Sequence, residues 1–413
     1  MVSSGPASAF ASRDFLLYWA GVVLSEIGLR GTVAVNLYHV YALTGSTAQV
    51  GVVGLLQGLA IVTLSPLGGA IADRVDRRRL LQVTQSLSLL ASLTLGLLSV
   101  AGIVTAWHIY LAVLVNTAAS AFDSPARTAL IPSLVPRSDI ARAFSLVTPT
   151  RELAILIGPA LGGVLTALVG PGLMYLVDAA TYLVLIIVLA MLRIPPTRTT
   201  AREVAMWSSI RDGAAYVVRR PILGHLMALD ISTTILAGWR IVLPALVVDE
   251  LDAGAAVYGL LAAIPSAGAL LGTVIVVRAG AALLDGRSVL GATFAYGAAC
   301  ILLANAPTVT LALIAGVLIG ATDALASVVR DTVVQLETPD ELRGRVTSIY
   351  LIAVRGGPAL GGANVGLLGA IWTPVLALSL GGALPIMVAV GYAVWGGRVR
   401  DYRQSAVDPE GTG

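Results

Sequence analysis

The stretch Gly68-Gly69-Ala70-Ile71-Ala72-Asp73-Arg74-Val75-Asp76-Arg77-Arg78-Arg79 decides the fold of this chain. It stands between two long apolar segments, and its last seven residues carry six charges, which hydrocarbon does not accommodate. We therefore expect a tight turn at one face of a membrane, with Gly68 and Gly69 allowing a neighbouring helix to come close. An ordinary basic loop is the simpler alternative, but it would need neither the two aspartates nor the glycine spacing.

The composition is that of an integral membrane protein. Of the 413 residues, 57% are hydrophobic and 12% are charged, whereas soluble domains carry about 25% charged residues. The one cysteine, Cys300, stands in an apolar segment, so neither a disulfide framework nor a cysteine metal cluster is expected. A cleavable signal peptide is not expected either, because the first apolar segment is too long and no small-residue cleavage site follows it.

The basic residues exclude several functions, because all 26 of them are arginine. Without lysine the chain has no Walker A loop for ATP and no Schiff-base nucleophile. The histidines His39, His108 and His225 are scattered and form no catalytic motif. We expect no enzymatic activity, no cofactor, no metal site and no nucleic-acid partner, although the pI is about 9.1.

Twelve segments are long enough to span a bilayer as helices, which takes ~20 apolar residues each. They are 15–41, 48–72, 79–101, 106–133, 138–168, 172–193, 221–248, 253–279, 286–304, 307–336, 340–368 and 372–397.

The distribution of arginine sets the expected orientation. Twenty of the 26 arginines fall in the termini and the loops on one side of these segments, while one opposite loop is acidic, with Asp249, Glu250 and Asp252. By the positive-inside rule both termini are cytoplasmic, in a multi-pass protein of a bacterial cytoplasmic (inner) membrane.

The two halves of the chain repeat each other. Gly158-Pro159-Ala160-Leu161-Gly162-Gly163 recurs as Gly357-Pro358-Ala359-Leu360-Gly361-Gly362, and Ala121-Phe122-Asp123 matches Ala321-Thr322-Asp323. Two six-helix bundles around a central cavity are the transporter arrangement that such a repeat indicates. We expect bundles at 1–193 and 221–397, a tail at 398–413, and a linker at 194–220 that forms an amphipathic helix or, alternatively, a disordered segment.

Several motifs point to one family. The pattern from Gly69 to Arg78 resembles the signature loop between helices 2 and 3 of the major facilitator superfamily. The Gly158–Gly163 motif is similar to the signature of its antiporters. Residues 342–346 and 213–221 resemble its enterobactin-exporter and macrolide-efflux branch, the drug:H⁺ antiporter-3 group. The resemblance implies an all-α, twelve-helix facilitator fold and proton-coupled export by alternating access.

The chain departs from the family pattern at two places. Asn116 stands where the antiporters have an arginine, and the loop between helices 8 and 9 keeps only Arg278, Asp285 and Arg287 of the signature.

The resemblance also implies a conformational latch at the inner face. In the family the equivalent of Asp73 caps helix 11, and Arg77 is expected to reach Asp123, for which a substrate contact is the alternative. The latch residues are Gly69, Asp73, Arg74, Arg77, Arg78 and Asp123. The hinge candidates, with plain packing as their alternative, are Gly158, Pro159, Gly162, Gly163, Gly357, Pro358, Gly361 and Gly362.

Charged residues within the membrane are costly and therefore mark candidate sites. The proton-coupling candidates are Glu26, which can pair with Arg30 four residues on, Glu152 and Asp230. Asp178 and Asp323 are further candidate carboxylates: Asp178 lies shallow on the outer side, with plain solvation as its alternative, and Asp323 is expected to mirror Asp123. The candidate cavity residues are Arg30, Asn116, Arg151, Arg240 and Arg355, with internal ion pairs as the alternative, and Arg127 and Arg330 are expected at the inner interface.

The arginines favour an anionic or metal-chelating aromatic cargo, because guanidinium groups bind carboxylate and catecholate oxygens and stack on rings. The sequence thus predicts a monomeric exporter of a small, siderophore-like or drug-like molecule. An uncoupled facilitator or importer and a lipid flippase are the alternatives.

Overall fold

The structure is a computed structural model, and it describes residues 12–72, 74–192, 215–216, 219–235, 237–339, 346 and 361–402. Every regular element in this described part is helical. The chain forms two compact units. Unit 1 comprises Met1–Glu203 with Ala253–Ala263, and unit 2 comprises Val204–Asp252 with Ile264–Gly413.

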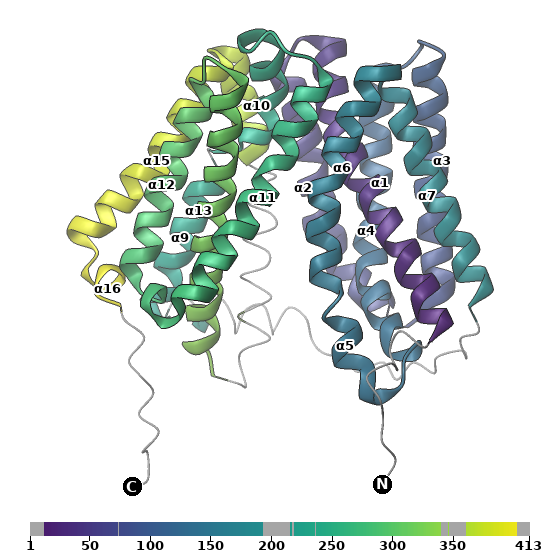
Figure 1. Cartoon of the computed structure of the whole chain (residues 1–413), viewed down its shortest axis with the longest axis horizontal. Helices are drawn as coiled ribbons and strands as arrows, with labels where there is room; N and C mark the ends of the chain where they lie inside the picture. The colour runs from purple at the N-terminus through teal and green to yellow at the C-terminus, as the bar shows by residue number, and fades with distance from the viewer. Residues whose placement is uncertain are drawn as a thin grey trace, which may run out of the picture. The chain divides into compact units, whose positions relative to one another are not determined.

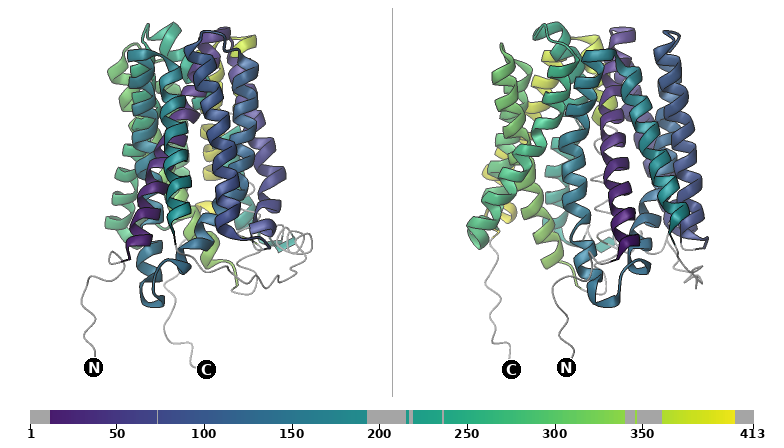
Figure 2. Two further views of the ribbon diagram at one scale, coloured as in Figure 1. Left: turned by 90° about the vertical axis from the view of Figure 1, so that its right-hand side faces the viewer. Right: turned by 45° about the vertical axis from the view of Figure 1, so that its right-hand side comes forward.

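Unit 1 is a bundle of long helices that lie side by side in all three views (Figures 1 and 2). Its helices are α1 (Arg13–Thr44), α2 (Thr47–Ala72), α3 (Arg77–Val100), α4 (Ala106–Leu130), α5 (Ile140–Phe144), α6 (Val147–Val169) and α7 (Pro171–Met191). Local signals set several of these ends. The Ser12 hydroxyl accepts from the N–H of Phe15 at the start of α1, and Gly45 ends this helix with φ 59°. The Asp76 carboxylate caps α3 through the N–H of Arg79.

The predicted membrane segment 138–168 is shorter in the structure. The short helix α5 and a 3-10 turn at Arg137–Asp139 precede α6, which begins at Val147. The charges of Arg137, Asp139 and Arg142 explain the difference, because they keep this part of the chain out of the hydrocarbon.

Unit 2 holds α9 (Pro221–Ile235), α10 (Trp239–Ala245), α12 (Gly286–Ala304), α13 (Val309–Leu336), α15 (Pro374–Trp395) and α16 (Gly397–Arg400). It also holds the helix Gly361–Ile371 and the part of α11 (Ala255–Ala279) from Ile264 onward. The predicted segment 221–248 is broken rather than continuous. Residues Ala237 and Gly238 separate α9 from α10, and α10 passes at Leu246 into a π-helical turn that ends at Glu250.

Ten helices of the described part are long and apolar enough to cross a membrane. Helix α4 has 25 residues but carries Asp123 and Arg127, and Gly361–Ile371 is short because residues 347–360 lie outside the described residues. The all-helical fold is therefore confirmed, while twelve spans cannot be counted in the described part. Most of the predicted linker also lies outside it, so the domain limits at 193 and 220 stay predictions.

Candidate functional site

The two arginines at the start of α3 bind the ends of neighbouring helices. Arg77 Nη1 donates to the carbonyl of Ala129 at 2.9 Å, and Arg78 Nη2 donates to the carbonyl of Ala190 at 2.6 Å. These carbonyls belong to the last turns of α4 and α7, where the helix dipole favours a cation. The charged turn thus stabilises one end of unit 1.

The predicted contact between Arg77 and Asp123 is absent. The α3 residues that face Asp123 are Thr84 and Gln85, whose side chains donate to its Oδ1 at 3.2 and 2.7 Å. They lie seven and eight positions after Arg77, which is roughly 10–12 Å along a helix. Arg77 therefore cannot occupy the same level of the bundle as Asp123.

Asp123 pairs instead with Arg127, one turn further along α4. Arg127 also reaches α1, where it contacts Glu26 Oε1 at 3.3 Å and donates to the Ser25 hydroxyl at 3.1 Å. On α1, Glu26 further contacts Arg30 at 3.6 Å, so the predicted pairing of these two residues is confirmed. We call Glu26, Arg30, Asp123 and Arg127 the charged cluster of unit 1.

The charged cluster is electrically balanced and mostly enclosed. Two carboxylates face two guanidinium groups, and the Arg127 side chain is only 12% exposed. Arg127 stands in the last turn of α4, where it pairs with Asp123 of the same helix and with Glu26 of α1; its predicted position at the inner interface stays a prediction. The internal ion pair, which the sequence left as an alternative, is the arrangement found here.

Unit 2 contains a matching pair. Asp230 of α9 and Arg330 of α13 form an ion pair at 2.5 Å, and both side chains are almost fully buried. Glu26 and Arg127 are 101 positions apart, and Asp230 and Arg330 are 100 apart. The repeated halves thus place an acid of their first helix against an arginine of their fourth.

The remaining charges of unit 2 are more open. Asp323 is exposed on α13, and both Arg330 and Arg240 are close enough to interact with it electrostatically. Arg240 is exposed on α10, with its guanidinium 4.6 Å from the ring centroid of Trp239. This cation–π contact leaves the guanidinium edge available for hydrogen bonds.

Two polar predictions within unit 1 need correction. Asn116 is buried and its amide donates to the Ser92 hydroxyl of α3 at 3.5 Å, so the structure gives no support to direct contact with cargo. The sequence placed Asp178 near the outer side with solvation as its alternative, but this residue is 0% exposed. Its depth along α7 does not decide its burial, because α1 and α3 cover it from the sides.

The glycines of the α6 motif lie at helix crossings. A Cβ atom on Gly158 would stand 2.7 Å from Arg30 Cβ and from the carbonyl of Ile27, so this glycine makes room for Arg30 on α1. A Cβ on Gly163 would stand 2.6 Å from the Cα of Gly259, in the part of α11 that belongs to unit 1. Helix α6 runs unbroken through Pro159.

The other glycines of the hinge and latch sets lie in different surroundings. In unit 2, a Cβ on Gly238 would meet Gly361 and Gly362 at 3.3 Å. A Cβ on Gly69 would meet no atom within 4 Å, whereas one on Gly68 would collide with the carbonyl of Ala121. Among the described residues Gly68, rather than Gly69, is therefore the glycine of close approach. The predictions for Asp73, Arg355, Gly357 and Pro358 lie outside the described residues.

The other predicted charges have few partners. Arg151 is exposed and Glu152 half-buried on α6, and neither forms an ion pair with another residue of the described ranges. Arg74 is exposed on the turn before α3.

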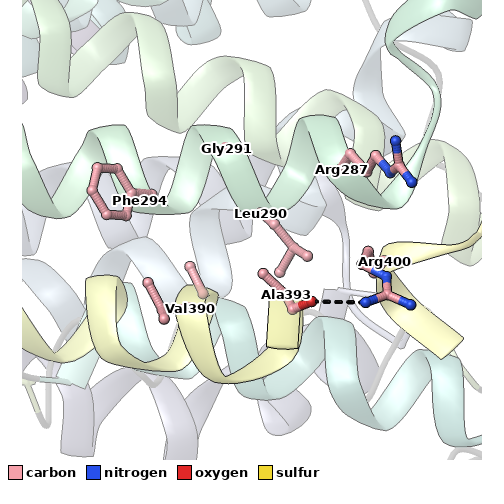
Figure 3. A pocket seen from close by; sticks show the side chains of 8 residues that line it. Arg287, Leu290, Gly291, Phe294, Val390, Ala393 and Arg400 are labelled. Carbon is pink, nitrogen blue, oxygen red and sulfur yellow. Dashed lines mark hydrogen bonds between the residues drawn. The ribbon is translucent and has the colours of Figure 1, made fainter. Parts of the chain in front are cut away.

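A pocket of about 330 Å³ lies between α12 and α15 in unit 2 (Figure 3). Its walls are mainly apolar, with Arg287 and Arg400 at one end, and Arg400 is already paired with Asp401 and bonded to the carbonyl of Ala393. None of the buried ion pairs opens into it, so it does not extend the charged clusters.

Sequence reasoning missed several residues that hold the site together. Gln85 and Ser92 are uncharged, and only the packing of α3 against its neighbours reveals their roles. Tyr258 of α11 donates to the carbonyl of Ala34 at 2.8 Å, and its ring lies 5.2 Å from that of Tyr38. A tyrosine within an apolar helix was the available signal, because buried hydroxyls require a partner.

Comparisons with known proteins identify the family of this chain. The model of the transmembrane secretion effector family, which is part of the major facilitator superfamily, matches residues 4–411. The chain belongs to this family. The enterobactin exporter EntS of Citrobacter koseri is 29% identical over 401 residues, covering 96% of this chain and 94% of the relative. EntS of Shigella boydii is 30% identical over 396 residues, covering 95% and 92%.

Solved structures give the same fold. A bacterial homologue of the human lysosomal transporter Spinster, in an inward-facing, occupied conformation, has a TM-score of 0.74 at 15% identity and covers 98% of this chain and 100% of its own. The nucleoside transporter NupG has a TM-score of 0.73 at 13% identity, covering 95% and 100%. The transporter is thus a multi-pass, non-enzymatic membrane protein with the facilitator fold, as predicted.

Proposed function

We propose that this transporter exports a small anionic or metal-chelating aromatic molecule of the siderophore class. The curated relatives over nearly the whole chain carry the name enterobactin exporter. Enterobactin-like molecules present catecholate oxygens and aromatic rings, which guanidinium groups bind and stack upon. A drug-like cargo of similar chemistry is the broader form of the same proposal.

One observation within the charged cluster carries the assignment of the cargo contact. The exposed fractions of the side chains are 35% for Arg30, 21% for Glu26 and 12% for Arg127. Arg30 is therefore the most open cation of the cluster, and it contacts Glu26 at 3.6 Å. We assign Arg30 as a cargo ligand in unit 1 and, by its exposure and its stacked ring, Arg240 as one in unit 2.

We also propose that transport is coupled to protons by antiport, with alternating access and the latch around Asp73. Glu26 contacts two arginines and Asp230 contacts one, so in this conformation each carboxylate is the counter-ion of an arginine. An uncoupled facilitator or importer and a lipid flippase are the competing functions.

Purified transporter in proteoliposomes tests the proposal with enterobactin as the probe. We expect saturable enterobactin transport that a pH gradient drives and that Arg30→Gln and Arg240→Gln each weaken about tenfold or more in KM, the loss of one charge-assisted bond. Arg278→Gln, which removes an exposed arginine at the end of α11, is the matched control and should leave KM unchanged. Competition by tetraphenylphosphonium but not by catecholates would refute the anionic cargo, and transport of labelled phospholipid alone would favour the flippase.

A further inference from the structure

A carboxyl group in the interior of unit 1 forms no ion pair with any residue that the structure describes. Asp178 of α7 is 0% exposed, and its Oδ2 accepts a hydrogen bond from the Ser92 hydroxyl of α3 at 2.9 Å. Its Oδ1 is enclosed and has no hydrogen-bond partner among the described residues. An ionised carboxylate in such a place costs several kcal/mol, unlike Asp123 and Asp230, which each face an arginine.

The groups that face Asp178 come from three other helices. Helix α1 contributes Gly28, where a Cβ atom would stand 2.7 Å from Oδ1, and Thr32. Helix α3 contributes Ser92, and α4 contributes Asn116 behind it, whose amide donates to that serine. None of these residues titrates or carries a charge.

A titratable group close to Asp178 is Tyr182, one turn further along α7. This buried tyrosine interacts electrostatically with Asp178 and also with Arg127, Asp123 and Glu26. No arginine or histidine of the described residues forms an ion pair with Asp178.

A proton on Asp178 would give one of the unpaired atoms around it a hydrogen-bond partner. A protonated carboxyl group has one O–H donor and keeps its acceptor capacity. The hydroxyl oxygen of Thr32 and the amide oxygen of Asn116 are both buried without a partner in the described part of the chain. The new donor can bond to Thr32, while Oδ2 continues to accept from Ser92.

We propose that Asp178 is the proton-binding carboxyl group of this transporter and that it holds its proton in the conformation seen here. This inference rests on the proposed proton antiport and names the group that performs it. When the proton leaves, the O–H bond breaks, its electron pair stays on the carboxylate, and the proton passes to water.

Helix α1 links this site to the cargo. Gly28 lets the neutral carboxyl group lie directly against α1, and Glu26 and Arg30 are carried by the same helix. An ionised Asp178 must gain water, which requires α1 and α7 to separate at Gly28. Loss of the proton would thereby move Arg30, and binding of cargo to Arg30 would in turn alter the affinity of Asp178 for its proton.

Infrared spectroscopy of the purified transporter tests the proton without any cargo. We expect the C=O stretching band of a buried, protonated carboxylic acid at neutral pH, its loss as pH is raised, and its absence in Asp178→Asn. Asp249→Asn, which changes an exposed aspartate of the outer loop, is the control and should leave the band unchanged. A spectrum without this band in the wild type, or with the band retained in Asp178→Asn, overturns the proposal. Absence of the band together with a melting temperature that rises with sodium would assign Asp178 to a metal cation instead.

Proteoliposomes loaded with enterobactin test the coupling. Asp178→Asn mimics the protonated group, so we expect enterobactin exchange to persist while its acceleration by a pH gradient is lost. Wild-type stimulation by the gradient in this variant overturns the coupling role. If the wild type does not transport enterobactin, the cargo proposal fails, while the infrared result still decides whether Asp178 holds a proton.

Discussion

At the scale of single residues, Arg127 organises the interior of unit 1 because it neutralises two carboxylates from two helices. Removing one partner of a buried ion pair leaves an uncompensated charge. We expect Arg127→Gln to destabilise the purified transporter by about 3–5 kcal/mol in the free energy of unfolding. Its thermal unfolding in detergent measures the change.

A second variant separates this charge effect from lost packing. In the double variant Asp123→Asn, Arg127→Gln, the neighbouring carboxylate is neutral as well, so we expect part of the stability to return. If the stability losses of Asp123→Asn and Arg127→Gln simply add in the double variant, the two side chains do not interact favourably beyond their packing.

The sequence predicts some of these contacts and hides others. Asp123 and Arg127 are four positions apart, a spacing that places them on one face of a helix. The contact of Asp230 with Arg330 joins residues 100 positions apart, and no local pattern shows it. For Asp178 the sequence left solvation open, because its depth was estimated along α7 alone. Lateral packing by α1 and α3 buries it, and that packing depends on glycines such as Gly28.

At the scale of helices, glycine positions set how closely two elements approach. In Gly163→Ala the new methyl group would meet backbone atoms of Gly259 and Ala255, which cannot move aside as a side chain can. We expect a loss of about 1–3 kcal/mol in stability from overpacking, together with slower transport. Thermal unfolding and enterobactin flux measure the two effects.

Gly224→Ala provides the matched control for the α6 prediction. Gly224 is also a helical glycine, on α9, but a Cβ there would meet nothing within 4 Å. We expect unchanged or slightly higher stability in this variant, since alanine favours a helix. Equal losses in both variants would contradict a role for the crossing of α6 with α11.

A second helix-scale prediction concerns the end of unit 2. The Tyr402 hydroxyl donates to Glu337 Oε1 at 3.2 Å, and burial together with this carboxylate raises the pKa of Tyr402 from 10.0 to about 12. Because the pKa is raised in the folded protein, the contact stabilises fully below pH 10 and is lost as pH rises through about 12. Melting temperatures across this range should fall more steeply for the wild type than for Tyr402→Phe. Parallel curves would show that the contact contributes nothing.

The limits of helices were harder to predict than their existence. A prediction from apolar length alone merged the charged turn at Arg137–Asp139 with α6 into one span. It also merged α9 with α10 across Gly238. In both places the chain stays apolar enough to resemble one span. At the break between α9 and α10, Gly238 lies close to Gly361, which is 123 positions away and therefore gives no local signal.

At the scale of the whole molecule, the internal repeat predicted from two short motifs also appears in the charges. The offset between Glu26 and Asp230 is 204 positions, and that between Arg127 and Arg330 is 203. Both halves thus contain the same kind of ion pair, between an acidic residue of the first helix and an arginine of the fourth. The acid is glutamate in one half and aspartate in the other, and the offsets differ from the 199 and 200 positions that separate the two repeated motifs, so the motifs alone could not reveal it.

The orientation of the chain in the membrane is the last prediction, and the single cysteine makes it testable. Cys300 is fully buried, so the wild type should not react with a membrane-impermeant maleimide and can serve as the background. We introduce one cysteine at exposed Glu250, in the acidic loop, and another at exposed Ser138, among the arginines before α6. Since arginine-rich loops stay in the cytoplasm, Glu250→Cys should react in intact spheroplasts and Ser138→Cys only after permeabilisation. The reverse pattern would show that the transporter has the opposite orientation in the membrane. Labelling of both sites in intact spheroplasts would contradict the assignment of these loops to opposite faces.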